Sequence, residues 1–411
     1  MVDNNMIKCR ACTQPKLEKF LILGPQPLAN SYLNHKQAQE AETFYPLDVC
    51  VCANCNFVQL GYVVSPDEMF RNYLYFSSYS DAGKKQYAEL AGEVVQMLGG
   101  KGFAVEIASN DGILLKNFLG TGVRGLGVEP AVNVAKVAQS IGVETVVEFF
   151  SEKTAKMISE KYGKADVVIG TNVFAHVPDL DDLMRGLDVL LKENGIAVFE
   201  SPYFVDLLNH TEFDTIYHEH CSYLSVRPLV GLFKRFGFEI YDVKRFPIHG
   251  GSIRFYVKRA ADTSHTVTPR IKELVDLELS MGLDKISTYR AFGHKIQELK
   301  VELTELLAKL KLQGNKIAGY GAAAKGNTLL NYFNIGPETL DFIADRSPHK
   351  NGFYTPGKRI PIKGVEALLT EKPDYVLILA WNFAEEIMQQ QAAYKNAGGK
   401  FIIPVPKPQI V

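Results

Sequence analysis

The stretch Val105-Glu106-Ile107-Ala108-Ser109-Asn110-Asp111-Gly112 decides the fold, because it reads as an apolar strand that ends in a turn of small and polar residues. Such a turn lets the backbone approach a ligand closely at the C-terminal edge of a parallel sheet. It differs from the GxGxxG pattern of dinucleotide sites. The stretch therefore predicts a ligand-binding loop after the first strand of an α/β unit.

Short apolar runs alternate with helical stretches beyond this loop. The expected strands are residues 103–107, 124–128, 143–149, 165–171 and 195–201, and the expected helices are residues 112–118, 132–141 and 180–191. This alternation predicts a parallel sheet with helices on both faces. A later pair of runs, residues 238–246 and 251–259, is expected to close the sheet with an antiparallel edge.

Two acidic residues frame the loop and indicate which ligand it binds. Glu106 lies on the strand and can face a cation, and Glu129 ends the second strand, where an acid can accept both hydroxyls of a ribose. Because no glycine run cradles phosphates, S-adenosylmethionine is favoured over NAD. An acid after a strand is also often a turn residue or a helix cap. The expected cofactor-binding residues are Glu106, Ala108, Ser109, Asn110, Asp111, Gly112, Glu129, Pro130 and Asn172.

Five of the six cysteines lie in the first 55 residues and include two CxxC pairs. Two such turns can hold four thiolates around one ion, which favours zinc in a structural site without an open position. The expected ligands are Cys9, Cys12, Cys52 and Cys55. Cys50 could replace Cys52, although the CxxC turn favours Cys52. A redox CxxC or scattered free thiols are the alternatives to a metal site.

Length and charge restrict the classes of protein. The 411 residues predict two or three domains, and a net charge of −1 with a pI of about 6.8 gives no general attraction to nucleic acid or anionic membrane. No apolar stretch is long enough to span a bilayer, and the first ten residues lack the apolar core of a signal peptide. We therefore expect a cytoplasmic protein with reduced thiols and with no nucleic-acid or membrane partner.

A second α/β series follows a long helical stretch near the C-terminus. Residues 271–312 are expected to be helical, with Gly282 and Gly293 as candidate breaks, and strands are expected at residues 316–321, 340–344 and 375–380. The expected units are therefore a metal-held module at 1–64, a central unit at 65–260 and a C-terminal α/β unit at 261–411.

The C-terminal unit contains a turn, Gly319-Tyr320-Gly321-Ala322-Ala323-Ala324-Lys325-Gly326, that opens a helix and can present backbone N–H groups to an anion. Lys325 adds charge there, although close helix–strand packing would also explain the small residues. Arg346 ends the next strand at the same crevice. Arg254 follows another small-residue turn and is expected to face a substrate, unless that turn is an ordinary hairpin.

The run Tyr217-His218-Glu219-His220 follows the fifth expected strand. It would bury too many polar groups to be only core. Histidine titrates near neutrality and a neighbouring carboxylate can orient it, which favours acid–base chemistry. A metal site and a polar surface loop are the alternatives, but the spacing differs from the HExxH of helical zinc sites. Asn172 and His176 follow the fourth strand and are expected to reach the same crevice.

The order of the motifs resembles that of a known family. CxxC…CxxC is followed by YxYFSSYS, VEIASNDG, NVFAHVPDL, YHEHCSY and GYGAAAKGNTLLN, over nearly the whole chain. The chain resembles the zinc-containing deoxysugar C-methyltransferases, which act on nucleotide-linked 4-keto-6-deoxyhexoses. The resemblance implies a zinc module, a central Rossmann-like class I S-adenosylmethionine methyltransferase fold, and a C-terminal Rossmann-like domain that helps to hold the sugar nucleotide.

The resemblance also implies roles for individual residues. A base removes the proton from C3 beside the C4 ketone, and the enolate carbon then accepts the methyl group. His220 is implied as the base, with Tyr217, Glu219 and His176 as its companions and Tyr75 covering the sugar. The substrate-binding residues expected are Tyr79, which competes with Tyr75 for that place, Tyr203, Arg254, Lys325 and Arg346.

Three other functions stay open on the sequence alone. They are an O- or N-methyltransferase on another small molecule or on RNA, a zinc-ribbon interaction protein without catalysis, and a nicotinamide oxidoreductase built on GYGAAAKG. The near-neutral pI disfavours RNA. The oxidoreductase lacks the acid about 20 residues downstream that binds a ribose, unless Asp345 serves.

Overall fold

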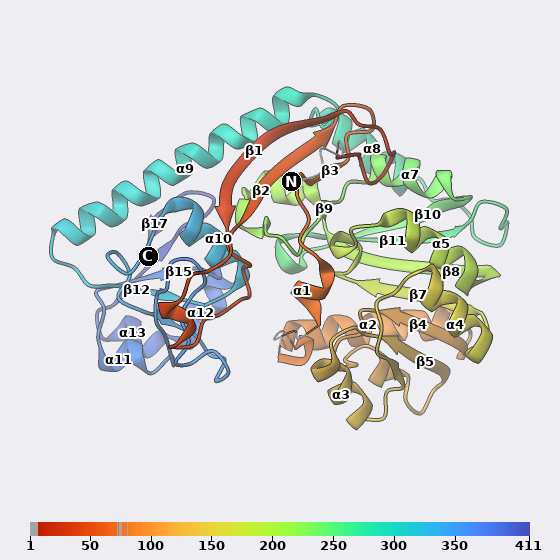
Figure 1. Ribbon diagram of the computed structural model, residues 1–411, viewed down its shortest axis with the longest axis horizontal. Coiled ribbons are helices and arrows are strands. Elements are labelled where there is room, and N and C mark those ends of the chain that lie inside the picture. Colours follow the sequence, from red (N-terminus) through yellow and green to blue (C-terminus); the bar gives the residue numbers. More distant parts are fainter. Residues whose placement is uncertain (1–6, 72, 74–75, 80) are drawn as a thin grey trace.

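The central sheet carries the predicted ligand-binding loop. The computed structural model describes residues 7–71, 73, 76–79 and 81–411. The strands of this sheet are β4 (Lys101–Ile107), β5 (Gly122–Val128), β6 (Thr145–Val146), β7 (Ala165–Thr171), β8 (Leu191–Pro202), β10 (Phe238–Phe246) and β11 (Ser252–Arg259). They lie in the order β10-β11-β8-β7-β4-β5-β6, and β11 runs antiparallel to both of its neighbours. The predicted parallel sheet with an antiparallel edge is confirmed (Figure 1).

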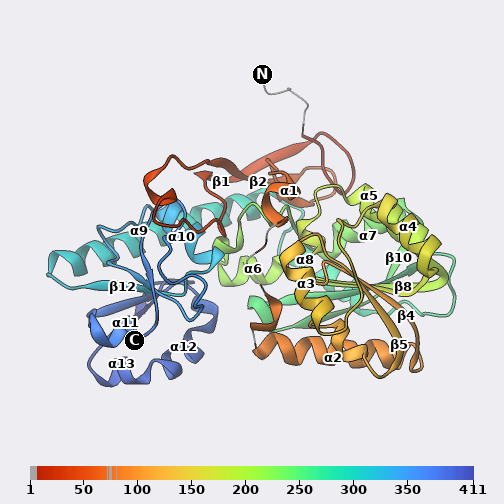
Figure 2. The same cartoon turned by 60° about the horizontal axis from the view of Figure 1, so that its bottom comes forward.

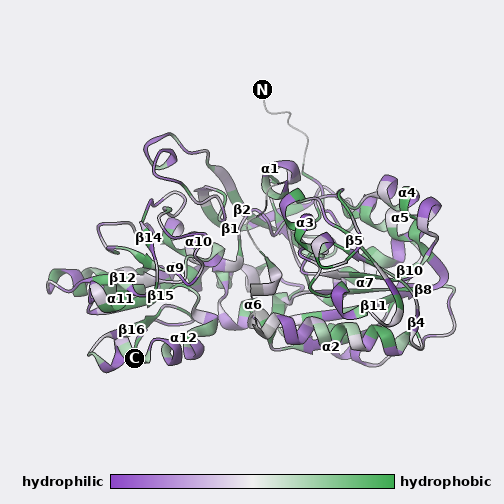
Figure 3. Cartoon of the chain, turned by 90° about the horizontal axis from the view of Figure 1, so that it is seen from below, coloured by the Kyte–Doolittle hydropathy of each residue, from purple (hydrophilic) through white to green (hydrophobic). Residues whose placement is uncertain are grey.

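Helices cover both faces of this sheet, and each face has its own hydrophobic core. One core contains residues of α2 (Asp81–Met97) and α3 (Val132–Ser140), and the other contains residues of α4 (Glu152–Tyr162), α5 (Leu180–Leu190) and α7 (Val226–Arg235). Figure 2 shows α2 below the sheet and α4 and α5 above it. In Figure 3, hydrophobic and hydrophilic segments alternate along α2, as expected for a helix with one buried side.

Helix α5 shows how the sequence defines these elements. The carboxylate of Asp179 accepts the backbone N–H of Asp182 at 2.9 Å and caps the first turn. Apolar residues at positions 180, 183, 184, 187 and 190 form one buried stripe. Each such side chain contributes roughly 1.5–3 kcal/mol when fully buried. The helix ends where Leu191 takes extended backbone and enters β8.

The helix expected at residues 112–118 is shorter in the structure. Only a 3-10 turn, η3 (Leu115–Phe118), forms, because Gly112 has a φ of +76°. A Cβ on Gly112 would lie 3.1 Å from side-chain atoms of Ala138 and Val143. The ligand-binding loop therefore needs glycine at this position both for its backbone angle and for its packing. The third expected strand is likewise reduced, to the two residues of β6.

The N-terminal module is a small antiparallel sheet of β1 (Leu17–Gln26), β2 (Tyr45–Cys52) and β3 (Val58–Leu60). A fourth strand, β9 (Ser222–Tyr223), pairs with β3 and comes from the segment directly after His220. The module therefore shares a sheet with the candidate catalytic segment, which the expected boundary at residue 64 did not anticipate.

The C-terminal unit is a second, mostly parallel sheet with helices. Its strands are β12 (Ile317–Tyr320), β13 (Ile343–Ala344), β14 (Ile362–Lys363), β15 (Tyr375–Ile378), β16 (Lys400–Ile403) and β17 (Gln409–Ile410), and its helices are α10 (Ala324–Phe333), α11 (Ala367–Thr370), α12 (Ala384–Gln390) and α13 (Ala392–Asn396). The order β14-β13-β12-β15-β16-β17 is antiparallel only at β17. The Rossmann-like arrangement expected for this unit is present.

The long helical stretch is divided into α8 (Arg270–Ser280) and α9 (Ile286–Leu312). Gly282, with a φ of +74°, marks the break, whereas Gly293 lies inside α9. The Glu278 carboxylate of α8 accepts backbone N–H groups of Val226 and Arg227 at 2.6 and 2.9 Å. These contacts join α8 to the central unit. Helix α9 then spans both units along one side of the molecule (Figure 1).

Short elements complete the described chain. They are η1 (Gln37–Gln39), α1 (Pro66–Phe70), η2 (Ser77–Tyr79), η4 (Phe174–His176), α6 (Phe204–His210), η5 (Phe213–Thr215), η6 (Ile248–Gly250) and η7 (Trp381–Phe383). Among the helices that the structure describes, none has the length and apolar character needed to cross a membrane.

Candidate active site

The four cysteines of the two CxxC pairs converge in the N-terminal module. Their Sγ atoms all lie within 4.8 Å of one another, and the Cys9–Cys55 and Cys12–Cys52 pairs are 3.5 and 3.6 Å apart. Sulfur atoms at about 2.3 Å from a tetrahedral zinc ion would be about 3.8 Å apart. The set therefore fits one zinc ion held by four thiolates. Within the described ranges it is the only such group of potential ligands.

Cys50 is not part of this set. Its Sγ faces Gly61, where an added Cβ would lie 3.2 Å away. Burial raises the pKa of its thiol. The structure thus resolves the choice that the sequence left open, with Cys52 in the cluster and Cys50 as a separate buried thiol. His218, Glu219 and His220 do not form a metal-ligand cluster among the described residues.

The loop after β4 has the strained backbone of a ligand site. Ala108, Asn110 and Gly112 have φ values of +53°, +49° and +76°. Non-glycine residues rarely adopt such angles, with Asn the commonest exception, and residues held in this way are frequent at ligand sites. Gly127 on β5 makes room for the loop, since a Cβ there would lie 2.3 Å from Ser109 Oγ. The expected loop therefore forms at the C-terminal edge of the sheet.

Two acidic groups of this loop are buried. Glu106 Oε2 and Asp111 Oδ1 are buried and have no hydrogen-bond partner in the described part of the chain. Burial, together with the charges of Glu129 and Asp111, raises the pKa of Glu106 well above its usual value. A bound cation would favour the ionised carboxylate. S-adenosylmethionine carries a sulfonium and an ammonium group, so these residues fit it.

Glu129 stands at the end of β5 and shapes the same loop. Its two carboxylate oxygens accept the N–H groups of Asn110 and Ala131 at 2.9 and 2.8 Å. Pro130, which follows Glu129, is buried. Each oxygen keeps a further lone pair for a ribose hydroxyl. Asn172, with a φ of +55°, follows β7 at the same edge and donates its N–H to the Glu200 carbonyl at 2.7 Å.

The tyrosine-rich segment reaches over this loop. The backbone N–H groups of Ser77 and Ser78 donate to the side chains of Asn110 and Asp111 at 2.9 and 3.1 Å. Tyr75 lies outside the described residues, and only the backbone of Tyr79 is described, so the choice between these two tyrosines stays a prediction. The contacts of Ser77 and Ser78 nevertheless join the segment to the cofactor loop.

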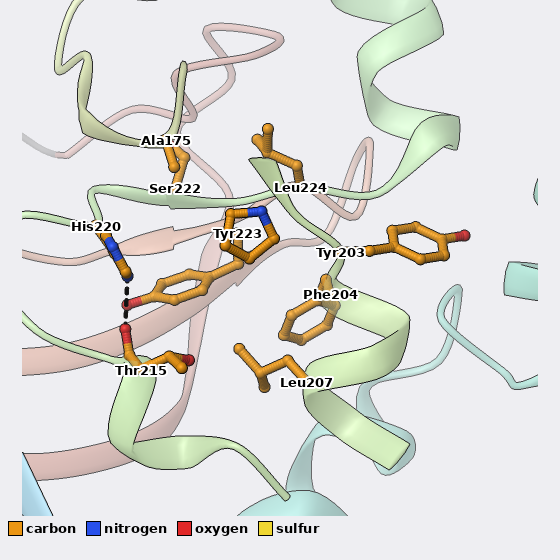
Figure 4. A pocket seen from close by; sticks show the side chains of 10 residues that line it. Ala175, Tyr203, Phe204, Leu207, Thr215, His220, Ser222, Tyr223 and Leu224 are labelled. Atoms are coloured by element: carbon orange, nitrogen blue, oxygen red, sulfur yellow. Dashed lines mark hydrogen bonds between the residues drawn. The ribbon is translucent and has the colours of Figure 1, made fainter. Parts of the chain in front are cut away.

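His220 is held in one orientation by a backbone carbonyl. Its Nδ1 lies 2.7 Å from the Thr215 oxygen, and Figure 4 shows these two groups facing each other at the edge of a small cavity. A carbonyl can only accept, so Nδ1 carries the proton and Nε2 of the neutral ring has the lone pair. This is the tautomer that a general base needs.

Two aromatic neighbours surround His220. The His176 ring stacks on it with centroids 5.0 Å apart, and the Tyr217 ring lies 4.1 Å away. Phe70 stacks on the other side of His176 at 5.7 Å. Burial and the adjacent His220 lower the pKa of His176 well below its usual value, so His176 is neutral at neutral pH. Because its pKa is low, His176 is a weak base that can donate a hydrogen bond without competing with His220 for a proton.

His218 and Glu219 point to other partners. His218 Nε2 lies 3.3 Å from the Pro46 carbonyl, and burial lowers the pKa of this histidine. The Glu219 carboxylate accepts from Asn30 Nδ2 at 2.6 Å and from the Tyr73 hydroxyl at 2.7 Å. The two histidines of the run are thus separated, and Glu219 links the N-terminal module to the tyrosine-rich segment.

Comparison with known proteins agrees with this geometry. Residues 9–70 match a family model described as "Putative zinc binding domain", residues 80–243 match "Methyltransferase domain" and residues 247–406 match "C-methyltransferase C-terminal domain". The C-methyltransferase NovU of Streptomyces niveus is 36% identical over 409 residues, covering 98% of this chain and 96% of the relative. This chain belongs to the zinc-containing C-methyltransferase family.

Solved structures match a smaller part of this C-methyltransferase. A SAM-dependent methyltransferase of Thermotoga maritima is 18% identical, covers 42% of this chain and 90% of its own, and has a TM-score of 0.32. Magnesium protoporphyrin IX methyltransferase of Synechocystis PCC 6803, with bound SAM, is 12% identical, with 43% and 79% coverage and a TM-score of 0.32.

Two residues predicted to contact substrate are buried in structural contacts instead. Tyr203 is fully buried, donates its hydroxyl to Glu278 at 2.8 Å and turns its ring away from His220 (Figure 4). Arg254 is 3% exposed and contacts Glu200 through Nε at 2.9 Å and Nη2 at 2.7 Å, and Glu93 through Nη1 at 2.7 Å. The polar groups of both side chains contact buried or partly buried glutamates of the C-methyltransferase itself.

Lys325 and Arg346, which were also predicted to bind substrate, lie in the C-terminal unit. Lys325 is 3.4 Å from Glu212 and 5.1 Å from the centre of the Trp381 ring. Arg346 is largely exposed and lies 3.9 Å from Glu386. Asp345 accepts the N–H of Ala322 at 2.7 Å. One backbone N–H of the glycine-rich turn is therefore bonded to a side chain of the same unit.

A cleft of about 590 Å³ opens between the central and C-terminal units of this C-methyltransferase. Its volume lies within the usual range of ligand pockets. The lining side chains combine charged groups with one indole, and include Asp206, His210, Glu212, Arg245 and Trp381. Lys325 contacts two of these residues and therefore lies at the cleft.

Several residues of the site escaped the sequence analysis. Thr215 contributes a backbone carbonyl, which no motif reveals. Asn30 and Tyr73 meet Glu219 only in the folded chain. Trp381 could have been found, because it is the only tryptophan and directly follows the expected strand at residues 375–380, where a Rossmann-like sheet binds ligands.

Proposed function

We propose that this C-methyltransferase transfers a methyl group from S-adenosylmethionine to C3 of a nucleotide-linked 4-keto-6-deoxy sugar. The observation that carries the proposal is the hydrogen bond from His220 Nδ1 to the Thr215 carbonyl, which leaves Nε2 as a proton acceptor. Stacking on His176, which follows β7, brings His220 to the same edge of the sheet as the cofactor loop. A carbon nucleophile requires such a base, because a C–H group is not nucleophilic by itself.

The first step is removal of the C3 proton by His220. The C4 ketone acidifies that C–H bond, so its electron pair passes to the ketone oxygen as the proton moves to Nε2. Neutral His176 and Tyr217, whose rings lie beside the base, are candidate hydrogen-bond donors to the enolate oxygen. The imidazolium formed at His220 is stabilised by its bond to the Thr215 carbonyl.

The second step forms the new carbon–carbon bond. Bound S-adenosylmethionine supplies an electrophilic methyl group on a sulfonium. Glu106, Asp111 and Glu129 would hold the cation and the ribose, and Ser77 and Ser78, which are hydrogen-bonded to the loop, would limit access of water. The methyl group would pass to the enolate carbon, S-adenosylhomocysteine would leave with the electron pair of the broken S–C bond, and His220 would return its proton to solvent.

The cleft between the units is the proposed place for the nucleotide. Lys325 and Arg245 offer charge to a diphosphate, and Trp381 offers a flat ring. The charges of these cations are shared with Glu212 and Asp206 in the structure.

A panel of nucleotide-linked 4-keto-6-deoxyhexoses, incubated with S-adenosylmethionine and analysed by mass spectrometry, tests the proposal. We expect one member to gain a single methyl mass, with the label on C3 by NMR. The enzyme should also catalyse deuterium exchange at C3 in D₂O when S-adenosylhomocysteine replaces the methyl donor. A methyl group on oxygen or nitrogen, or no exchange at C3 of any member, would refute the enolate reaction.

A further inference from the structure

The carbonyl that holds His220 lies on a segment between the central and C-terminal units. This segment, residues 212–216, contains η5 (Phe213–Thr215) and directly precedes Tyr217. The Nδ1–H of His220 has Thr215 as its acceptor at 2.7 Å. The direction of Nε2 therefore depends on where residues 212–216 hold that carbonyl.

Contacts to the C-terminal unit hold both ends of this segment. The Lys325 ammonium lies 3.4 Å from Glu212 at the beginning, and the Thr328 hydroxyl donates to the Ile216 carbonyl at 3.3 Å at the end. The cation, Lys325, and the hydroxyl donor, Thr328, both belong to α10. The segment is therefore attached to the C-terminal unit at each end.

Asp214 attaches the middle of the segment. Its side chain is completely buried, its Oδ2 accepts the indole N–H of Trp381 at 2.6 Å, and its Oδ1 has no partner within the described chain. Burial raises the pKa of Asp214 to about 6, against the opposing effects of Lys325 and the indole N–H. A buried carboxyl with one partner is costly to release, so the Trp381 bond fixes where Asp214 lies.

We propose that the hydrogen bond between Trp381 and Asp214 is a positioning contact for His220, through which the C-terminal unit aligns the catalytic base. Asp214 and Thr215 are consecutive, so displacement of the Asp214 side chain moves the carbonyl that orients the imidazole. The inference rests on the proposed role of His220 as base. Neither Asp214 nor Trp381 exchanges a proton with substrate in this arrangement.

The same contact couples ligand binding to the base. Trp381 and Glu212 line the cleft between the units. A molecule in the cleft would therefore touch the ring that holds Asp214 and the carboxylate that begins the segment. Occupation of the cleft and alignment of His220 are linked through these shared residues.

Substitutions that keep or remove the hydrogen bond test the proposal. Trp381→Phe keeps an aromatic ring for Lys325 but removes the N–H donor, and Asp214→Ala removes the acceptor. We expect either change to slow methylation and C3 deuterium exchange about 10- to 100-fold, as misplacement of a reacting group by an ångström does. The affinity for S-adenosylmethionine should stay near its wild-type value, because neither residue lies at the loop after β4. Asp214→Asn, which keeps an acceptor, should retain most of the rate.

The double variant and a control test whether a slower rate comes only from destabilisation of the C-terminal unit. Trp381→Phe with Asp214→Ala should be no slower than either single variant, because both remove one interaction. Tyr394→Phe removes a buried hydroxyl that donates to the Pro373 carbonyl at 3.0 Å within the C-terminal unit. It should leave the rate unchanged while lowering thermal stability slightly.

The ring ¹⁵N shifts of His220 provide a readout without substrate. The wild type should show the Nδ1–H tautomer, and Trp381→Phe should shift the equilibrium toward the other tautomer. Unchanged shifts and a wild-type rate in Trp381→Phe would overturn the inference while leaving the proposed function intact. If the wild type acts on no keto sugar, the proposed function fails, and the tautomer measurement still decides whether Trp381 positions His220.

Discussion

Replacing Arg254 by methionine would show whether this cation serves the architecture or the substrate. The guanidinium lies over the Phe246 ring at 4.3 Å and contacts Glu200 twice and Glu93 once. Methionine keeps much of the apolar contact with Phe246 but removes every donor. Glu200, only 2% exposed, would then keep the Gln86 amide as its side-chain partner.

The structure gives the size of this effect. Removing one member of a buried ion pair costs about 3–5 kcal/mol, because the other charge is left uncompensated. Each kcal/mol lowers the Tm of a domain of this size by about 2–4 °C, so a decrease of roughly 6–20 °C is expected. The partly exposed pair of Arg185 and Glu152 is the matched control, and Arg185→Met should leave the Tm almost unchanged because solvent screens this pair.

The loss should also depend on pH. Burial raises the pKa of Glu200, and Arg254 opposes that rise. Without Arg254, the pKa of Glu200 in the folded state moves further above its value in the unfolded state. The variant is then most stable while Glu200 is protonated, and it loses stability as the pH rises through the folded-state pKa of Glu200. The deficit relative to wild type should therefore be larger at pH 8 than at pH 5, and Glu200→Gln should restore much of it.

Thermal unfolding followed by circular dichroism at both pH values, together with KM measurements, is the assay. An Arg254→Met variant with wild-type Tm at pH 8 but a greatly increased KM for the sugar nucleotide would refute this reasoning. It would return Arg254 to the substrate-binding role that the sequence analysis expected.

Four further substitutions test the remaining parts of the site. His220→Asn keeps a donor for the Thr215 carbonyl but loses the base, so kcat should fall about 10²- to 10⁴-fold while S-adenosylmethionine still binds by calorimetry; near-normal turnover would exclude His220 as base. Glu129→Ala should weaken cofactor binding, and an unchanged dissociation constant would argue against its ribose contact. Cys52→Ser should reduce both the zinc content by elemental analysis and the Tm, whereas Cys50→Ser should retain a full complement of zinc; the reverse result would exchange their roles.

Features that depend on residues close in sequence were predicted well. The CxxC spacing identified the four converging thiolates, and the alternation of strands and helices identified the central sheet with its antiparallel edge. Gly282 was correctly chosen as a helix break, whereas Gly293 was not one, because glycine inside a long helix costs only about 1 kcal/mol.

Features that depend on distant contacts could not be predicted. Arg254 has a partner, Glu200, on the neighbouring strand β8, which the sequence does not place beside it. The acceptor of His220 is a main-chain atom, so no residue type at position 215 would have revealed it. Trp381 and Asp214 meet only after two separate sheets have formed and docked.

The sharing of one sheet by the zinc module and the segment after His220 has a consequence for biosynthesis. Strand β3 ends at Leu60, but its partner β9 begins at Ser222. At a translation rate of roughly 5–20 residues per second, the module leaves the ribosome roughly 10–30 s before its last strand exists. During that time zinc, rather than pairing with β9, must hold β3 in its folded position. In a cell short of zinc, β3 would therefore not be in place to pair with β9 when the candidate catalytic segment is synthesised.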